Sequence, residues 1–107
     1  MELIIERLPE ETLEDFADKH DLTMKVVERK TTQYGEKFYA SFVGVEIKEG
    51  EILRGAFGNG EIPDEAIANY AREISHKHLV KDAMRTWRKE IIAPKLIYFG
   101  SNGKHDK

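Results

Sequence analysis

The stretch between Gly55 and His78 constrains the fold more than any other part of the chain. It reads GAFGNGEIPDEAIANYAREISHKH, which is typical of a strand end, a glycine-rich turn and an amphipathic helix. Pro63 suits the first helical turn because its φ is preset and it has no N–H to leave unpaired. Ile62 holds the position of the N-cap, so either Asn59 or Asp64 caps the helix in another way or the helix begins without a side-chain cap. An apolar stripe follows at helical spacing: Ala66, Ile67, Tyr70, Ala71 and Ile74. We therefore predict a helix packed on a sheet.

The glycines before this helix do not form a nucleotide-binding loop. Neither G-x-G-x-x-G nor a terminal Gly-Lys-Ser/Thr is present, and the carboxylates of Asp64 and Glu65 would repel a phosphate at the helix N-terminus. We predict that Gly58, Asn59 and Gly60 form a tight turn that needs positive φ.

The composition is that of one soluble globular domain. The chain has 107 residues, of which 40% are hydrophobic and 35% charged, and no apolar run is long enough to span a bilayer. It has no cysteine, which excludes disulfides and thiolate chemistry. No signal peptide is recognised, because only the short run Leu3–Ile5 is apolar near the start. We predict one α+β domain over residues 1–99, a mobile polar tail over 100–107 and a cytoplasmic location.

The first half of the chain reads as one helix followed by strands. Leu13, Phe16 and His20 lie on one side of the first helix, whose dipole would favour protonated His20 at its C-terminal end. Alternating residues then predict three strands and two turns: strand Leu22–Thr32, turn Gln33–Glu36, strand Lys37–Ile47, turn Lys48–Glu51 and strand Ile52–Phe57. This is a three-stranded antiparallel meander between two helices. Both faces of its middle strand are apolar, so that strand is central or one of its faces meets a partner.

The segment after the second helix has two interpretations. Its apolar residues fit helical spacing, but His78–Ala83 and Arg88–Ala93 also fit the two strands of a hairpin. Lys95–Phe99 is a short apolar run, either an added strand or a docking segment.

Charge is distributed unevenly along the chain. Residues 1–71 hold 8 basic and 16 acidic residues, whereas residues 72–107 hold 9 basic and 4 acidic ones. Such asymmetry is typical of a polyanion-binding end, of head-to-tail pairing with a second copy, or of a solvated surface. The basic third contains a candidate patch around one aromatic residue: Lys77, Lys81, Arg85, Trp87, Arg88 and Lys89.

This patch has three interpretations. Trp87 could stack on a base while the cations contact phosphates, or it could anchor a protein interface, where Trp and Arg are favoured. Alternatively, Trp87 packs in the core and the cations stay solvated. Between the two functional interpretations we favour the protein interface, because the acidic remainder of the chain would oppose a nucleic acid.

Catalytic and metal-binding patterns are weak. His76 and His78 would point the same way on a strand and could share a metal, but the sequence singles out no third ligand. No nucleophile motif stands out. We therefore expect no catalytic residue, no metal and no cofactor.

The segments FYASFVGVEI, GAFGNG and IPDEAIANYAREI, between Phe38 and Ile74, resemble small phage and prophage proteins of unassigned function. The resemblance covers about two-thirds of the chain and implies a hairpin over His78–Ala93. Gly60–Ala66 is also similar to the turn of HicB-type antitoxin domains, with Ile62 in place of a threonine cap. The helix–three strands–helix outline resembles double-stranded-RNA-binding domains, but Asp64 and Glu65 stand where that family places phosphate-gripping lysines.

The sequence thus predicts an α+β fold with an antiparallel sheet of three to five strands and two helices on one face. We expect a small phage-type accessory or regulatory protein that acts through protein–protein contact in the host cytoplasm, as a homodimer or with another protein, and without membrane contact. The alternative is a nucleic-acid-binding protein that uses the basic C-terminal third around Trp87.

Overall fold

The computed structural model describes residues 1–5, 10–31, 33 and 35–100. These residues contain two helices and nine strands, so the predicted α+β class is confirmed. The elements are, in chain order, β1 (Glu10–Thr12), α1 (Leu13–His20), β2 (Met24–Glu28), β3 (Phe38–Phe42), β4 (Val45–Glu49), β5 (Ile52–Arg54), β6 (Gly58–Gly60), α2 (Pro63–Ile74), β7 (His78–Lys81), β8 (Lys89–Ile92) and β9 (Lys95–Ile97). Thr32 and Tyr34, which fall within a predicted strand and turn, lie outside the described residues, as does the tail after Gly100.

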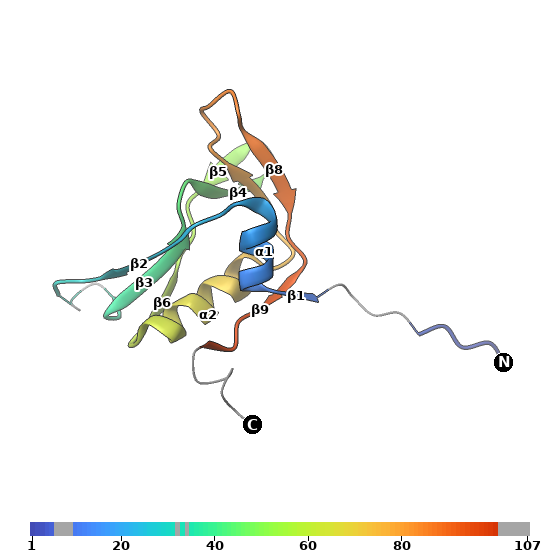
Figure 1. Cartoon of the computed structure of the whole chain (residues 1–107), viewed down its shortest axis with the longest axis horizontal. Coiled ribbons are helices and arrows are strands. Elements are labelled where there is room, and N and C mark those ends of the chain that lie inside the picture. Colours follow the sequence, from blue (N-terminus) through green and yellow to red (C-terminus); the bar gives the residue numbers. More distant parts are fainter. Residues whose placement is uncertain (6–9, 32, 34, 101–107) are drawn as a thin grey trace.

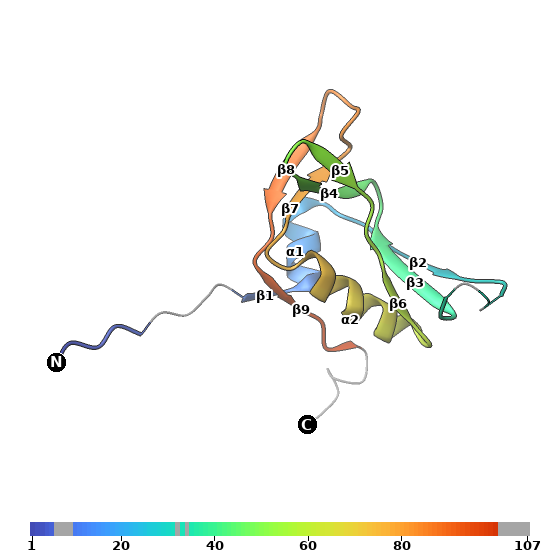
Figure 2. The same ribbon diagram turned by 180° about the vertical axis from the view of Figure 1, so that it is seen from behind.

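The strands form three sheets around the helices (Figures 1 and 2). One antiparallel sheet has the order β2-β3-β6, a second has the order β5-β4-β7-β8, and β1 pairs in parallel with β9. The ring of Phe42 on β3 lies 6.4 Å from the ring of Phe16 on α1 and 5.5 Å from that of Tyr70 on α2, measured between centroids. Both helices therefore pack on the same face of the β2-β3-β6 sheet, as predicted.

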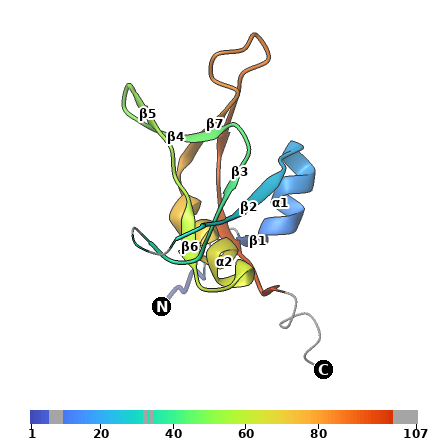
Figure 3. The ribbon, with the colours of Figure 1, turned by 90° about the vertical axis from the view of Figure 1, so that its left-hand side faces the viewer.

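The predicted single strand over Lys37–Ile47 is wrong. β3 ends at Phe42, the chain turns at Gly44 with a φ of 73°, and β4 begins at Val45. β3 stays between β2 and β6, whereas β4 enters the second sheet (Figure 3, where β4 and β5 lie above β3 and β6). The predicted three-stranded meander is therefore wrong as well. The turn lets Phe42 and Val45 both face the core, although strict alternation places them on opposite faces.

The predicted tight turn at Gly58 and Gly60 is also wrong. These residues form β6, which pairs with β3 in the register Gly58–Ala40 and Gly60–Phe38, and the predicted strand Ile52–Phe57 is strand only as far as Arg54. Neither glycine has positive φ. Instead, α2 lies so close to β6 that a Cβ on Gly60 would come within 2.5 Å of the Ala66 backbone nitrogen. The glycines are required by this close approach.

The predicted helix is confirmed as α2. It begins at Pro63 without a side-chain cap at Ile62, while the Glu65 carboxylate accepts a hydrogen bond from the Glu61 N–H at 2.6 Å. Its predicted stripe faces the sheets, with Tyr70 and Ile74 fully buried. Burial of this stripe stabilises a helix that its propensities and caps alone would leave marginal.

The two interpretations of the C-terminal third are resolved in favour of strands. β7 and β8 form an antiparallel hairpin with Leu79 opposite Ile91, so the helical alternative is wrong. β9 is the added strand predicted for Lys95–Phe99, and it pairs with β1 from the opposite end of the chain. The Ser75 hydroxyl ties α2 to β9, because it donates to the Ala71 carbonyl at 2.7 Å and accepts from the Leu96 N–H at 2.9 Å.

Candidate functional site

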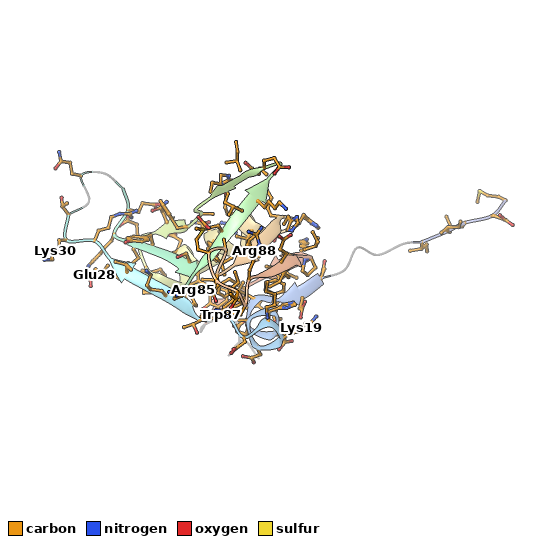
Figure 4. All side chains as sticks on the ribbon, turned by 90° about the horizontal axis from the view of Figure 1, so that it is seen from above. Lys19, Glu28, Lys30, Arg85, Trp87 and Arg88 are labelled. Atoms are coloured by element: carbon orange, nitrogen blue, oxygen red, sulfur yellow. The ribbon has the colours of Figure 1, made fainter. Side chains whose placement is uncertain are left out.

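Trp87 lies on the surface, in the loop between β7 and β8. Its side chain is 64% exposed, so the interpretation that it packs in the core is wrong. The indole N–H donates to Asp82 Oδ2 at 3.0 Å, and the Arg85 guanidinium lies 5.5 Å from the indole ring centroid. Figure 4 shows Arg85, Trp87 and Arg88 in this loop, while Glu28 and Lys30 lie at the far end of the β2–β3 hairpin.

The loop that carries Trp87 is anchored by its own backbone. Asp82 adopts a φ of 55°, and its N–H donates to the Gly44 carbonyl at 2.9 Å. The Arg85 N–H donates to the Asp82 carbonyl at 2.9 Å, and the Arg88 N–H to the Arg85 carbonyl at 3.2 Å. These consecutive turns hold Trp87 and Arg85 beside the turn that separates β3 from β4.

Two cations of the predicted patch bind carbonyls at the C-terminal end of α1. Lys81 Nζ donates to the Asp21 carbonyl at 2.6 Å, and Lys89 Nζ donates to the His20 carbonyl at 2.8 Å. Cations at this position satisfy the last carbonyls of a helix and favour its dipole. Burial, followed by the charges of Lys89 and Lys19, lowers the pKa of His20 below its ordinary value of 6.5, which is the reverse of the effect predicted from the helix dipole.

Arg88 and His78 both contact a single carboxylate. Arg88 pairs with Glu90 Oε2 at 2.7 Å, and His78 Nε2 lies 2.8 Å from Glu90 Oε1. The hydrogen bonds from Arg88 and from His78 lower the pKa of Glu90. Lys77, the remaining cation of the patch, donates from Nζ to the Glu73 carbonyl near the end of α2 at 3.4 Å. Among the described residues, five of the six predicted side chains, all but that of Arg85, thus contact carbonyls or carboxylates of their own chain.

The two histidines do not share a site. His76 follows α2 with a φ of 65°, outside any strand, while His78 opens β7 and faces Glu90. Within residues 1–5, 10–31, 33 and 35–100, no group of three His, Cys, Asp or Glu side chains could hold a metal ion.

A groove of about 600 Å³ lies beside Arg85, on the face of the β2-β3-β6 sheet that the helices leave open. Its lining includes Lys25, Tyr39, Ser41, Phe57, Met84 and Arg85, and we call it the open-face groove. Residues of β3 alternate between the two faces, so Ala40 and Phe42 are buried toward the helices while Tyr39 and Ser41 line the groove. The β7–β8 loop supplies the wall with Met84 and Arg85.

The floor of the open-face groove is aromatic. The rings of Tyr39 and Phe57 lie 5.5 Å apart between centroids, and Phe57 is 47% exposed. The Arg29 guanidinium lies 4.6 Å from the Tyr39 ring centroid and donates to Asn59 Oδ1 at 2.8 Å, which fixes it across the sheet. Met84 is 94% exposed at the groove wall. An apolar surface with cation–π contacts is thus open to a ligand.

Both cations and carboxylates border the groove. Lys25 on β2 lines it, and Arg29, in the segment that follows β2, lies over the Tyr39 ring. Arg85 in the β7–β8 loop is the third cation. Glu46 and Asp82 line the groove toward β4 and β7, where the Asp82 carboxylate accepts the indole N–H of Trp87. Arg29 thus favours a carboxylate or phosphate beside Tyr39, whereas Arg85 lies in the same loop as Asp82.

A smaller pocket of about 230 Å³ lies between α1, β2 and α2. Apolar side chains dominate its lining, including Leu13, Met24 and Ile67. Tyr98 closes it and donates to Asp64 Oδ1 at 2.8 Å; burial and this carboxylate raise the pKa of Tyr98 to about 12. The pocket lies within the main packing layer, and Glu14 and Tyr98 are the ionisable residues of its lining.

Sequence reasoning selected Arg85 and Trp87 but missed the residues of the groove floor. Tyr39 and Phe57 lie in segments that it predicted as ordinary strands, and Met84 lies in a segment for which helix and hairpin both remained open. One signal was available, because both faces of the strand around Tyr39 are apolar, which predicted either a central strand or a face that meets a partner.

Comparison with protein-family models, curated proteins and solved structures yields no match to this chain. Among the described residues, neither helix has the length and apolar character that crossing a membrane requires.

Proposed function

We propose that this protein is a non-catalytic binding module that acts through protein–protein contact, with the open-face groove as its docking surface. The observation that carries the proposal is the cluster of half-buried Tyr39 with exposed Phe57 and Met84 around a groove of about 600 Å³ on a sheet face without a helix. Aromatic residues, Met and Arg are the types enriched at protein interfaces, and hot spots gather in such concave apolar patches.

The chemistry of the groove favours a polypeptide that is apolar and acidic. Its floor offers aromatic rings, and Lys25, Arg29 and Arg85 stand beside them. A partner segment with alternating or adjacent apolar and carboxylate side chains would bury its apolar groups on the floor and pair its carboxylates at the rim.

The wider role remains the one expected from the sequence. The proposal includes a small accessory or regulatory protein of a phage or prophage, working in the host cytoplasm and forming homodimers. The resemblance over Phe38–Ile74 supports the phage-type role.

Site-specific photo-cross-linking in cells tests the proposal. A photoreactive amino acid at Phe57 should attach to a polypeptide in good yield, whereas the same group at Ile92 should not, because Ile92 is equally apolar and 68% exposed but lies outside the groove lining. Mass spectrometry of the adduct identifies the partner. Equal labelling from both positions, or no polypeptide adduct at Phe57, would contradict the proposal.

Nucleic-acid binding is the second candidate. It is favoured by Lys25, Arg29 and Arg85 beside the adjacent rings of Tyr39 and Phe57, since single-stranded nucleic acids bind to aromatic rings flanked by cations. It is weakened by the engagement of Lys81, Lys89 and Arg88 with their own chain. A gel shift with single-stranded and duplex probes separates the candidates: binding that falls with added salt and is lost in Arg85→Glu would establish nucleic-acid binding in place of protein contact.

A further inference from the structure

The N-terminal segment Met1–Ile5 exposes three consecutive large apolar side chains. Leu3, Ile4 and Ile5 are 74%, 79% and 74% exposed, and the segment has no helix or strand of its own. Single exposed apolar residues are ordinary, but an uninterrupted run is typical of a surface that another molecule covers. Glu2 precedes the run, and Glu6 follows it in the sequence.

The segment and the open-face groove have complementary chemistry. The segment presents apolar side chains next to Glu2, and the groove presents Phe57 and Met84 beside Lys25 and Arg85. Burying the run would remove apolar surface from water, and the Glu2 carboxylate would meet one of the cations. We propose that the open-face groove binds the Met1–Ile5 segment of a second copy of this chain.

The position of the segment favours a second copy over the same chain. β1, the first element after the segment, pairs with β9 next to α1, on the side of the molecule where the helices pack. The groove lies on the opposite face of the β2-β3-β6 sheet, and Figures 1 and 2 show the described N-terminal segment pointing away from the body of the molecule. When two copies each place a segment in the other's groove, the contacts are equivalent and the assembly closes as a two-fold dimer.

This inference rests on the proposed function, because it names the occupant of the same groove. Standard interfaces bury roughly 1,200–2,000 Å² of surface, and the short Met1–Ile5 segment would bury less, so the dimer should dissociate on dilution.

Sedimentation velocity of the full chain over a wide concentration range tests the inference. The wild type should pass from monomer to dimer as concentration rises. The arm variant, Leu3→Ser with Ile4→Ser and Ile5→Ser, and the groove variant, Phe57→Ser with Met84→Ser, should each remain monomeric. The matched control Ile92→Ser removes an equally exposed apolar side chain outside the groove and should dimerise like the wild type. Circular dichroism establishes that each variant is folded.

Mixing the two defective variants gives the sharper result. The arm variant retains its groove and the groove variant retains its arm, so together they should form a heterodimer through one segment in one groove, although neither self-associates. Failure of this complementation, or a wild-type dimer that survives the arm substitutions, would overturn the inference.

A synthetic peptide, MELIIE, identifies which idea has failed if the inference is wrong. Suppose that the wild type is monomeric and does not bind the peptide, whereas the arm variant binds it. The chain's own segment then occupies the groove. If the groove ignores the peptide but Phe57 cross-links to another polypeptide, the second-copy inference falls and the proposed function stands. If Phe57 cross-links only to nucleic acid, both fall.

Discussion

At the scale of single residues, the contact between β6 and α2 leaves no room for a side chain at Gly58. A Cβ placed there would lie 2.7 Å from the Tyr70 Cα and closer still to the Ala66 carbonyl oxygen. Both are backbone atoms, which cannot rotate aside as a flexible side chain can. The position of the helix on the sheet therefore depends on this glycine.

We expect Gly58→Ala to lower the free energy of unfolding by at least about 3 kcal/mol or to prevent folding, because helix and strand must separate to admit the methyl group. Gly55→Ala is the control: nothing lies within 4 Å of its Cβ position, so its effect should stay within about 0.5 kcal/mol. Urea denaturation followed by circular dichroism measures both. Equal effects of the two substitutions would contradict the close-approach explanation of β6.

His20 should make stability depend on pH. Because burial and the neighbouring cations lower its pKa in the folded state, the unfolded chain binds the proton more readily. This contribution to stability is fully present above the ordinary pKa of 6.5 and is lost as the pH falls through 6.5 toward the folded-state value. Lys89→Gln removes one of the causes and should raise the pKa of His20, as measured by NMR titration of the imidazole. An unchanged or lower pKa in this variant would contradict the assignment.

At the scale of elements, the turn at Gly44 directs β3 and β4 into different sheets. Its φ of 73° suits glycine, and a Cβ would lie 2.8 Å from Asp82 Oδ1 in the β7–β8 loop. The Gly44 carbonyl in this turn accepts a hydrogen bond from the Asp82 N–H, and this bond positions the loop that holds Trp87 and Arg85. One position thus sets both the sheet topology and the wall of the open-face groove.

We expect Gly44→Ala to lower the free energy of unfolding by about 2 kcal/mol, through backbone strain and the clash with Asp82. Gly50→Ala separates the two causes, because Gly50 has a φ of 63° with nothing within 4 Å of its Cβ position and should cost only about 1 kcal/mol. Adding Asp82→Ala to Gly44→Ala should recover part of the difference. Thermal denaturation and Trp87 fluorescence follow the changes. If the double variant loses as much free energy of unfolding as the two single variants together, the clash with Asp82 is not the cause.

At the scale of the whole molecule, the uneven charge of the sequence is partly neutralised within one chain. Cations of the basic third contact the acidic first part: Lys95 lies 3.8 Å from Glu10, and Lys81 and Lys89 bind the carbonyls of Asp21 and His20. These contacts join the two ends of the chain, as does the β1–β9 pair. Lys25 and Arg85 line the open-face groove and would lie beside a partner there, so added salt should weaken the dimer expected above.

Several features could be predicted from the sequence because their signal lies within neighbouring residues. The start of α2 at Pro63, its uncapped Ile62 and its buried stripe follow from local backbone and periodicity rules. The exposed Trp87 beside Arg85 was selected for the same reason, since an aromatic residue among cations is visible in a short window. For the groove, the apolar character of both faces of the strand around Tyr39 indicated either a central strand or a partner surface; β3 is central, and the sequence did not indicate which residues would border a groove.

Other features required contacts between residues far apart in the sequence. A glycine needed for positive φ and a glycine needed for close approach look alike in the sequence, and only the position of α2 distinguishes Gly58 from Gly44. The groove likewise exists because β3, β6 and the β7–β8 loop come together, while Lys81 and Lys89 leave the predicted patch to cap α1. Local propensities specify which segments become helix or strand, but the packing that joins distant segments decides which side chains remain open to a partner.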